Sequence, residues 1–189
     1  MTIGIIDAKS GNLTSLENTL QRSDLNVKRL TEPNFDGINS LILPGQGRFG
    51  FVMSKLVEGG FVPAIKAWIN AGKPLVGICV GMQILFSASE EDPEAEGLAI
   101  FPEKVEQLTG PKRPLMGWVH VKWEKDWFKS GSAYFVNSYG VKSSSYSLAS
   151  IPYGEGFIAA VQRQNVTGFQ FHPEKSGTWG KELLKKCLL

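Results

Sequence analysis

The sequence predicts an α/β fold: a doubly wound, mainly parallel twisted sheet with helices on both faces and some antiparallel edge strands. In the first half of the chain, short apolar runs alternate with stretches of helical periodicity, which is typical of βαβ units around a parallel sheet. In the second half, apolar runs follow one another with few helical stretches between them, which indicates antiparallel strands. The length of 189 residues fits one domain over residues 1–189.

The first half of the chain contains four predicted strands and three predicted helices. The strands are residues 3–6, 26–30, 41–43 and 75–78. The first helix opens at Gly11 and Asn12 and repeats leucine at helical spacing, at positions 13, 16 and 20. The other two helices are residues 61–71, closed by Gly72 and Pro74, and residues 81–87.

The second half contains further predicted strands at residues 118–123, 133–136, 156–161 and 166–171. Residues 180–189 form a short amphipathic helix whose leucines face the core. Residues 90–96 hold five carboxylates, and the simplest interpretation is a solvated loop.

The composition excludes several classes of protein. Apolar residues make up 42% of the chain and charged residues 20%, as in an ordinary globular protein. The net charge of +2 provides no electrostatic footprint for nucleic acid. No apolar run approaches the roughly 18–20 residues of a membrane span. The first residues carry no basic segment and soon reach Asp7, so we expect no secretory signal and a cytoplasmic protein.

Cysteine and histidine usage indicates neither disulfides nor a metal. Two cysteines, Cys79 and Cys187, are too few for a disulfide framework or a four-cysteine zinc site. The two histidines, at positions 120 and 172, are not at metal-binding spacing, and no G-x-x-x-x-G-K-[ST] phosphate loop is present. We therefore expect no metal and no cofactor.

Cys79 lies where a predicted strand meets a predicted helix, in the sequence Gly77-Ile78-Cys79-Val80-Gly81. This is the G-x-nucleophile-x-G pattern of a nucleophile elbow, with cysteine in place of serine. Glycine is needed at both ends because a side chain there would clash with neighbouring backbone. A helix N-terminus beside the sulfur favours the thiolate. The alternative is a buried cysteine that only packs, as most free cysteines do.

His172 is the candidate base for this nucleophile. Pro173 holds His172 in an extended conformation, so His172 and Glu174 face the same side. A carboxylate there can orient the imidazole and stabilise its cation, although the same residues could simply end a strand. His120 lies in an alternating strand, where an exposed histidine is the simpler interpretation.

The segment Pro44-Gly45-Gln46-Gly47 follows another apolar strand. It should therefore lie at the same carboxyl-end edge of the sheet as Cys79. Backbone amides of this turn, together with the amide of Val80, can form an oxyanion hole. On its own, such a segment is more often an ordinary turn.

With these residues identified, the chain resembles the class I, or triad, glutamine amidotransferases. Residues 77–83 resemble their nucleophile elbow, and residues 170–176 resemble their His-Glu motif. Within that family the chain is similar to the glutaminase subunits of imidazole glycerol phosphate synthase. That similarity rests on residues 6–7 with 11–13, and on residues 43–47, 114–118 and 134–139, in family order.

The resemblance implies a catalytic triad in which Cys79 attacks the carboxamide of L-glutamine, His172 moves protons and Glu174 orients His172. It implies oxyanion and substrate-binding roles for Gly45, Gln46, Gly47, Val80 and Gln83. It also implies a heterodimer with a barrel-shaped cyclase subunit. That subunit uses the ammonia to make imidazole glycerol phosphate and an aminoimidazole carboxamide ribotide in histidine biosynthesis. The implied contacts with this partner are Asn12, Trp118, Asn137 and Lys175.

Several positions depart from that subfamily. It usually has valine at Gln46 and histidine at Leu115 and Asn137, and residues 8–10 also differ. These departures leave open a paralogous glutaminase that supplies ammonia for the amidation of a surface sugar. A non-catalytic subunit of the same fold is a further alternative, against which the intact triad argues. Without the resemblance, Trp118 as a half-buried strand residue and Lys175 as a solvated charge are equally expected.

Overall fold

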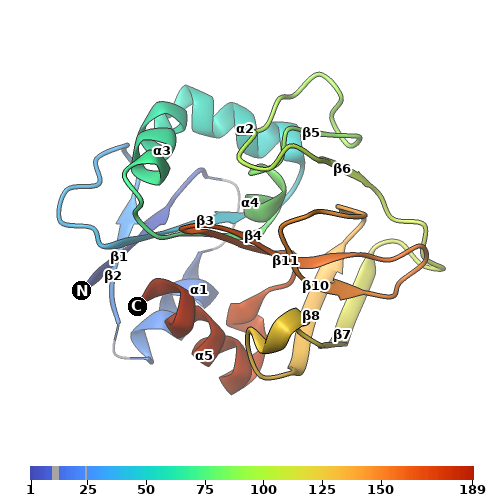
Figure 1. Ribbon diagram of the computed structural model, residues 1–189. Helices are drawn as coiled ribbons and strands as arrows, with labels where there is room; N and C mark the ends of the chain where they lie inside the picture. The colour runs from blue at the N-terminus through green and yellow to red at the C-terminus, as the bar shows by residue number, and fades with distance from the viewer. Residues whose placement is uncertain (10–12, 24) are drawn as a thin grey trace.

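The computed structural model describes residues 1–9, 13–23 and 25–189, with every side chain among them except that of Lys125. Its centre is a seven-stranded sheet in the order β10-β11-β12-β4-β3-β1-β2 (Figure 1). The parallel strands are β1 (Thr2–Ile6), β2 (Asn26–Leu30), β3 (Ser40–Gly45), β4 (Leu75–Cys79) and β12 (Val166–Phe169). Two antiparallel strands, β10 (Ser147–Ile151) and β11 (Phe157–Arg163), extend the sheet beside β12.

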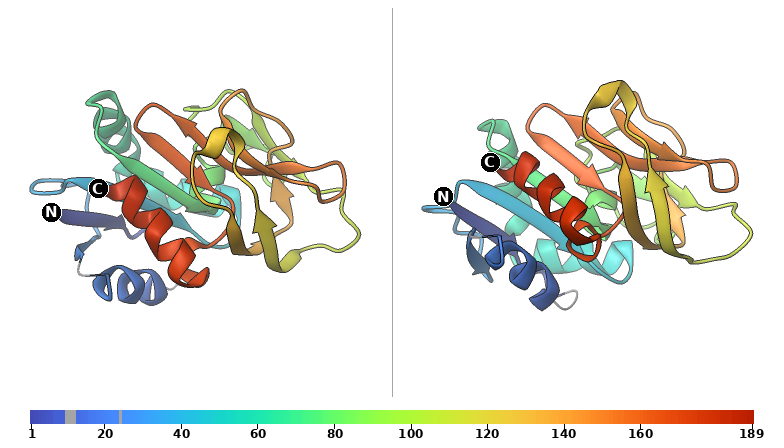
Figure 2. Two further views of the ribbon diagram at one scale, coloured as in Figure 1. Left: turned by 60° about the horizontal axis from the view of Figure 1, so that its bottom comes forward. Right: turned by 90° about the horizontal axis from the view of Figure 1, so that it is seen from below.

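Helices cover both faces of this sheet. On one face lie α2 (Phe49–Glu58), α3 (Phe61–Asn70) and the short α4 (Val80–Gln83), above the sheet in Figure 1. On the other face lie α1 (Thr14–Gln21) and α5 (Gly177–Leu188), which face the viewer in the right panel of Figure 2. The crossovers β1–α1–β2 and β3–α2–α3–β4 run in opposite directions along the sheet, which places their helices on opposite faces. The predicted fold class is confirmed.

The remaining strands lie outside the central sheet. β7 (Leu115–Val121) and β8 (Gly131–Asn137) form an antiparallel hairpin, joined through the 3₁₀ turn η1 (Glu124–Asp126). Three short strands pair separately: β5 (Ala88–Ser89), β6 (Lys104–Gln107) and β9 (Tyr139–Gly140). None of the helices in the described part of the chain is long and apolar enough to cross a membrane.

Two helices differ from the sequence-based prediction. The pattern predicted no helix over residues 49–58, yet α2 forms there and buries Phe49, Val52, Met53 and Leu56. The helix expected over residues 81–87 ends at Gln83, because the next residues make tighter turns. In those turns the Leu85 N–H donates to the Met82 carbonyl and the Phe86 N–H to the Gln83 carbonyl, and the Ser87 N–H then donates outside the helix, to the Glu103 carbonyl.

Glycine is required where β4 turns into α4. A Cβ at Gly81 would lie 1.8 Å from the carbonyl oxygen of Leu43 on β3. A Cβ at Gly77 would lie 2.7 Å from the carbonyl oxygen of Gly81 and 2.9 Å from the Cα of Met82. Because backbone atoms cannot move aside as a side-chain end can, the two glycines allow this turn to pack directly against the sheet.

We predict that Gly81→Ala lowers the free energy of unfolding by about 3 kcal/mol or more, because the new methyl group meets fixed backbone. Gly168→Ala on β12 is the matched control. Its Cβ would lie 2.8 Å from Met82 Cγ and 3.0 Å from Val161 Cγ2, which are side-chain atoms that can adjust. We expect a cost of about 1–2 kcal/mol for that variant. Urea unfolding of both variants measures the difference, and equal costs would contradict the assignment.

Candidate active site

The candidate site lies at the carboxyl ends of β3, β4 and β12, the edge where ligands bind in doubly wound folds. Gly45 pairs with Cys79 in the register of β3 and β4, and Phe169 pairs with Ile78 in that of β12 and β4. His172 follows β12 by three residues. The sheet thus brings together two sequence motifs that are more than 90 residues apart.

Cys79 occupies a strained backbone conformation at the end of β4. Its φ of 55° and ψ of −115° lie in a region that residues with a side chain rarely adopt, at a cost of about 1–3 kcal/mol. Such strain is characteristic of a nucleophile elbow. The side chain is 5% exposed, with Sγ 3.9 Å from the Val136 carbonyl oxygen and 4.0 Å from Gln170 Nε2.

His172 and Glu174 form a close side-chain pair. Nδ1 of His172 lies 2.8 Å from Oε1 of Glu174, and both side chains are buried. The backbone of His172 is fixed as well, because its N–H donates to the Tyr134 carbonyl at 2.9 Å. The Ser176 hydroxyl donates to the His172 carbonyl at 2.6 Å. The imidazole is therefore oriented by its neighbours on both sides.

The electrostatic environment keeps His172 protonated at neutral pH. Burial of the ring opposes its charge, but hydrogen bonds and negative charge from Cys79 and then Glu174 outweigh this and raise the pKa of His172 to about 10. An imidazolium beside Cys79 stabilises the thiolate, which is the nucleophilic form of cysteine. The three residues thus have the geometry and the charge of a nucleophile, a base and an orienting group.

A cavity of about 300 Å³ opens above Cys79, a volume suited to a small polar molecule. The predicted site residues that line it are Gln46, Gly47, Cys79, Val80, Gln83, Asn137, His172 and Lys175. Glu174 lies beside His172, outside the lining. Gly45 lies against α4, where a Cβ would be 2.5 Å from the backbone nitrogen of Gly81.

The residues predicted to contact a partner lie in different places. Trp118 is 59% exposed on the β7–β8 hairpin and packs edge-on against Tyr134, with ring centroids 5.9 Å apart. Lys175 is exposed at the mouth of the cavity, whereas Asn137 is only 6% exposed and lies within its wall. Asn12 lies outside the described residues. His120 is exposed on β7, as expected.

The amide groups of Gln83 and Asn137 differ in how they are satisfied. Nε2 of Gln83 donates to the Tyr139 carbonyl and to Oε1 of Gln170, both at 3.0 Å, so this amide nitrogen is held by the protein itself. Nδ2 of Asn137 also donates to the Tyr139 carbonyl, at 3.0 Å. Its Oδ1, however, is buried and has no hydrogen-bond partner among the residues that the structure describes. An unsatisfied acceptor in a cavity wall is a group that a ligand can pair with.

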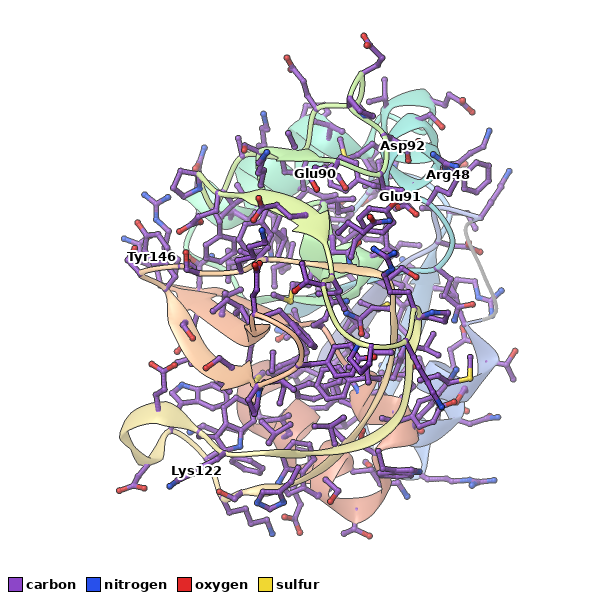
Figure 3. The ribbon with its side chains drawn as sticks, turned by 90° about the vertical axis from the view of Figure 1, so that its right-hand side faces the viewer. Arg48, Glu90, Glu91, Asp92, Lys122 and Tyr146 are labelled. Atoms are coloured by element: carbon purple, nitrogen blue, oxygen red, sulfur yellow. The ribbon has the colours of Figure 1, made fainter. Side chains whose placement is uncertain are left out.

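Glu91 is a cavity residue that the sequence did not single out. We expected residues 90–96 to form a solvated loop, yet Glu91 lines the cavity and its Oε2 accepts from the Phe49 N–H at 2.9 Å. Asp92 Oδ2 accepts from the Gly50 N–H at 2.9 Å. In Figure 3 the labelled side chains of Glu91, Asp92 and Arg48 lie together at this end of α2.

A sequence signal for this contact exists in residues 45–50, which read G-x-G-x-x-G between β3 and α2. In dinucleotide-binding proteins the same pattern places a pyrophosphate at the helix N-terminus. Here the N–H groups of Phe49 and Gly50 already bind the carboxylates of Glu91 and Asp92. The pattern thus marks a helix N-terminus that holds anionic groups of the chain itself.

The charge of His172 leads to a testable prediction. Replacing Cys79 with serine removes the neighbouring negative charge, so the pKa of His172 should fall by about 1–3 pH units from its value near 10. NMR titration of the imidazole signals measures this shift, with His120→Gln used to assign the two histidines. The pKa of His172 in the folded state is raised above its ordinary value of 6.5. Protonation of His172 therefore stabilises the folded protein fully below pH 6.5, and this stabilisation is lost as the pH rises through about 10. An unchanged midpoint in Cys79→Ser would contradict this account.

Comparison with known proteins identifies the family of this chain. Residues 5–189 match the family model for class-I glutamine amidotransferases. The imidazole glycerol phosphate synthase subunit HisH of Desulfitobacterium hafniense is 40% identical over 193 residues, which cover 97% of this chain and 92% of the relative. The HisH subunit of Thermotoga maritima is 36% identical, covering 100% of this chain and 96% of the relative.

Solved structures agree at the level of the fold. A crystal structure of a glutamine amidotransferase superposes with a TM-score of 0.82 at 20% identity, covering 98% of this chain and 96% of that one. The PurLQS structure from Thermotoga maritima superposes with a TM-score of 0.79 at 18% identity, covering 99% of this chain and 97% of that one. From the family match and the similarity to relatives over the full chain, we conclude that this chain is an enzyme of the class-I glutamine amidotransferase family, in the group of the HisH subunits.

Proposed function

We propose that this chain is the glutaminase subunit of an imidazole glycerol phosphate synthase. It hydrolyses L-glutamine to glutamate and ammonia and passes the ammonia to a cyclase partner in histidine biosynthesis. The observation that carries the proposal is the buried Cys79–His172–Glu174 arrangement at the nucleophile elbow. Its pathway rests on relatives with 36–40% identity that are named as HisH subunits.

In the first half of the reaction, the Cys79 thiolate attacks the side-chain carboxamide carbon of glutamine. The C=O electron pair moves onto oxygen and forms a tetrahedral oxyanion. When the oxyanion collapses, the C–N bond breaks and the nitrogen takes a proton from the His172 imidazolium, so that ammonia leaves. A γ-glutamyl thioester on Cys79 remains.

In the second half, neutral His172 removes a proton from water as the water oxygen attacks the thioester carbonyl. A second tetrahedral oxyanion forms and collapses, which breaks the C–S bond and releases glutamate. The thiolate of Cys79 and the imidazolium of His172 are restored together. The raised pKa of His172 suits the resting pair, and Glu174 keeps Nδ1 protonated so that the other ring nitrogen faces the reaction.

The oxyanion is stabilised by backbone N–H groups. Val80 is the first residue of α4, so its N–H has no acceptor within the helix and lies beside Cys79. The segment Gly45–Gly47 lines the other side, and Gly47 has a φ of +91°, a conformation that glycine adopts readily. A rotation of a peptide in this segment would replace a carbonyl with an N–H at the oxyanion. One such donor contributes on the order of 10²–10³ in rate.

The charged groups of the cavity suit a free amino acid. The carboxylate of Glu91 lines the cavity and can pair with the α-ammonium group of glutamine. The Ser138 hydroxyl also lines it and can donate to the α-carboxylate. The unpaired Oδ1 of Asn137 is a further acceptor for an N–H group of the substrate.

We place the cyclase partner, a barrel-shaped subunit, on the side of the chain that carries Trp118 and Lys175. An exposed tryptophan is an anchor type enriched in protein interfaces, and an exposed lysine can pair with an acidic side chain of the partner. Asn12 and Asn137 are assigned to the same interface through the family resemblance alone. In the resulting heterodimer, ammonia closes the imidazole ring, with release of the aminoimidazole carboxamide ribotide.

The triad leads to a prediction about mutants in the assembled complex. Cys79→Ala and His172→Ala should each lower glutamine-dependent activity by about 10⁴-fold or more. Glu174→Gln should lose less, because the base remains. Ammonia-dependent synthesis should stay close to wild type in all three, since that chemistry belongs to the cyclase. Assays of cyclase product formation with glutamine or with ammonia as the nitrogen source measure this, and glutaminase activity retained in Cys79→Ala would refute the nucleophile.

Control by the partner leads to a second prediction. If the oxyanion donor of the Gly45–Gly47 segment is absent in the free subunit, glutamine turnover should be about 10²–10³-fold slower there than in the complex with ligand on the cyclase. Steady-state glutaminase assays of the free chain and of the complex measure this ratio. A free subunit as fast as the complex would exclude the switch while leaving the triad unaffected.

A further inference from the structure

Arg48 is the residue that connects the oxyanion segment to helix α2. It follows Gly47 directly and precedes Phe49, the first residue of α2, with an extended backbone at φ −92° and ψ 147°. Its own side chain does not cap the helix. Its guanidinium instead reaches the acidic segment 90–92, as the labelled side chains in Figure 3 show.

The contact between Arg48 and this segment has three hydrogen bonds. Nη2 and Nε of Arg48 donate to Oδ1 of Asp92 at 2.5 and 3.2 Å, and Nη2 also donates to the Glu91 carbonyl at 2.8 Å. The hydrogen bond from Arg48 also holds the pKa of Asp92 below its usual range. Charge-assisted hydrogen bonds of this kind fix geometry as well as adding energy.

Two backbone bonds complete the contact. The N–H groups of Phe49 and Gly50 donate to the carboxylates of Glu91 and Asp92, both at 2.9 Å. These helix N–H groups have no acceptor within α2, and the helix dipole favours negative charge there. A Cβ at Gly50 would lie 3.1 Å from Asp92 Cβ and Cγ, so glycine allows the carboxylate to approach the backbone this closely.

The acidic segment 90–92 is itself held by hydrogen bonds to strand β6. Oε2 of Glu90 accepts from the Gln107 N–H at 3.0 Å, and Oε1 accepts from Lys104 Nζ at 3.3 Å. The Glu90 N–H donates to the Val105 carbonyl at 2.9 Å. Arg48 is thus tied to a fixed part of the structure and not to a free loop.

We propose that the Arg48–Asp92 pair is a positioning device for the oxyanion segment Gly45–Gly47. The pair holds the end of that segment against the loop that carries Glu91. Arg48 does not line the cavity itself, whereas Gln46, Gly47 and Glu91 do. Arg48 is therefore a positioning residue, acting through the segment that precedes it. The proposal rests on the proposed glutaminase function.

The exposure of the Arg48 side chain indicates that the pair contributes little to the stability of the fold. The side chain of Arg48 is 65% exposed, and ion pairs this exposed add little to folding free energy. Loss of the pair should therefore leave the melting temperature almost unchanged. A displacement of the oxyanion donors by about 1 Å, however, is enough to slow catalysis by up to about 10²-fold.

The experiment compares Arg48→Ala with Arg29→Ala in the complex with the cyclase subunit. Arg29 makes a pair of the same kind with Glu17, at 2.9 and 2.6 Å, between β2 and α1 and away from the cavity. We expect kcat of glutamine hydrolysis to fall about 10–100-fold in Arg48→Ala, with KM changed much less. We expect Arg29→Ala to keep wild-type kcat. Ammonia-dependent synthesis, measured in parallel, should match wild type in both variants.

A double-mutant cycle with Asp92→Ala tests the pair directly. If the two side chains act together, the double variant Arg48→Ala/Asp92→Ala should be no slower than Asp92→Ala alone. Additive losses would overturn the proposal, as would an Arg48→Ala variant with wild-type kcat. A rise in KM alone would also overturn it, because Arg48 would then act on substrate binding. A wild-type complex without glutaminase activity would instead remove the proposed function and this proposal with it.

Discussion

The close packing of the β4–α4 turn against β3 is the constraint on which the rest of the site depends. Gly77, Gly81 and Gly45 lack side chains at the points where backbone segments meet, and Cys79 accepts a strained conformation between them. Because the turn is so tight, the position of the sulfur is fixed by the sheet register. β3 on one side then brings the segment Gly45–Gly47 to Cys79, and β12 on the other side leads into His172.

The charges of the site are costly for the fold, which supports the catalytic roles proposed for them. Cys79, His172 and Glu174 are all largely buried, and within the described part of the chain the buried Oε2 of Glu174 has no hydrogen-bond partner. The attraction between such groups offsets only part of the free-energy cost of removing them from water. A protein selected for stability alone would place apolar side chains here. The unpaired carboxylate oxygen adds negative potential near the imidazole, which favours the protonated ring.

Local sequence patterns predicted much of the fold and the residues that meet at the candidate site, whereas contacts between distant segments were not visible in them. Strand 26–30 follows from its alternating pattern, the strand before Cys79 follows from its apolar run, and the elbow follows from five consecutive residues. Helix α2 was missed because its first turn is stabilised by carboxylates of Glu91 and Asp92, about 40 residues further along the chain. Residues 90–96 were interpreted as a solvated loop because these contacts with α2 join segments far apart in the sequence. The expected position of Gln83 in the cavity wall is found, whereas the hydrogen bonds from its amide nitrogen to Tyr139 and Gln170 join distant segments and could not be predicted.

The β7–β8 hairpin contacts both the exposed side chain of Trp118 and the backbone of His172. Trp118 and Tyr134 are paired across the two strands, and their rings are in contact. The carbonyl of Tyr134 accepts the backbone N–H of His172, and the Tyr134 N–H donates to the Ser176 hydroxyl, which in turn donates to the His172 carbonyl. A partner seated on Trp118 would therefore contact the strand pair that fixes the backbone of the base. Small displacements of this hairpin would reach His172 without passing through the core, because hydrogen bonds to the backbone on both sides of the imidazole come from Tyr134 and Ser176.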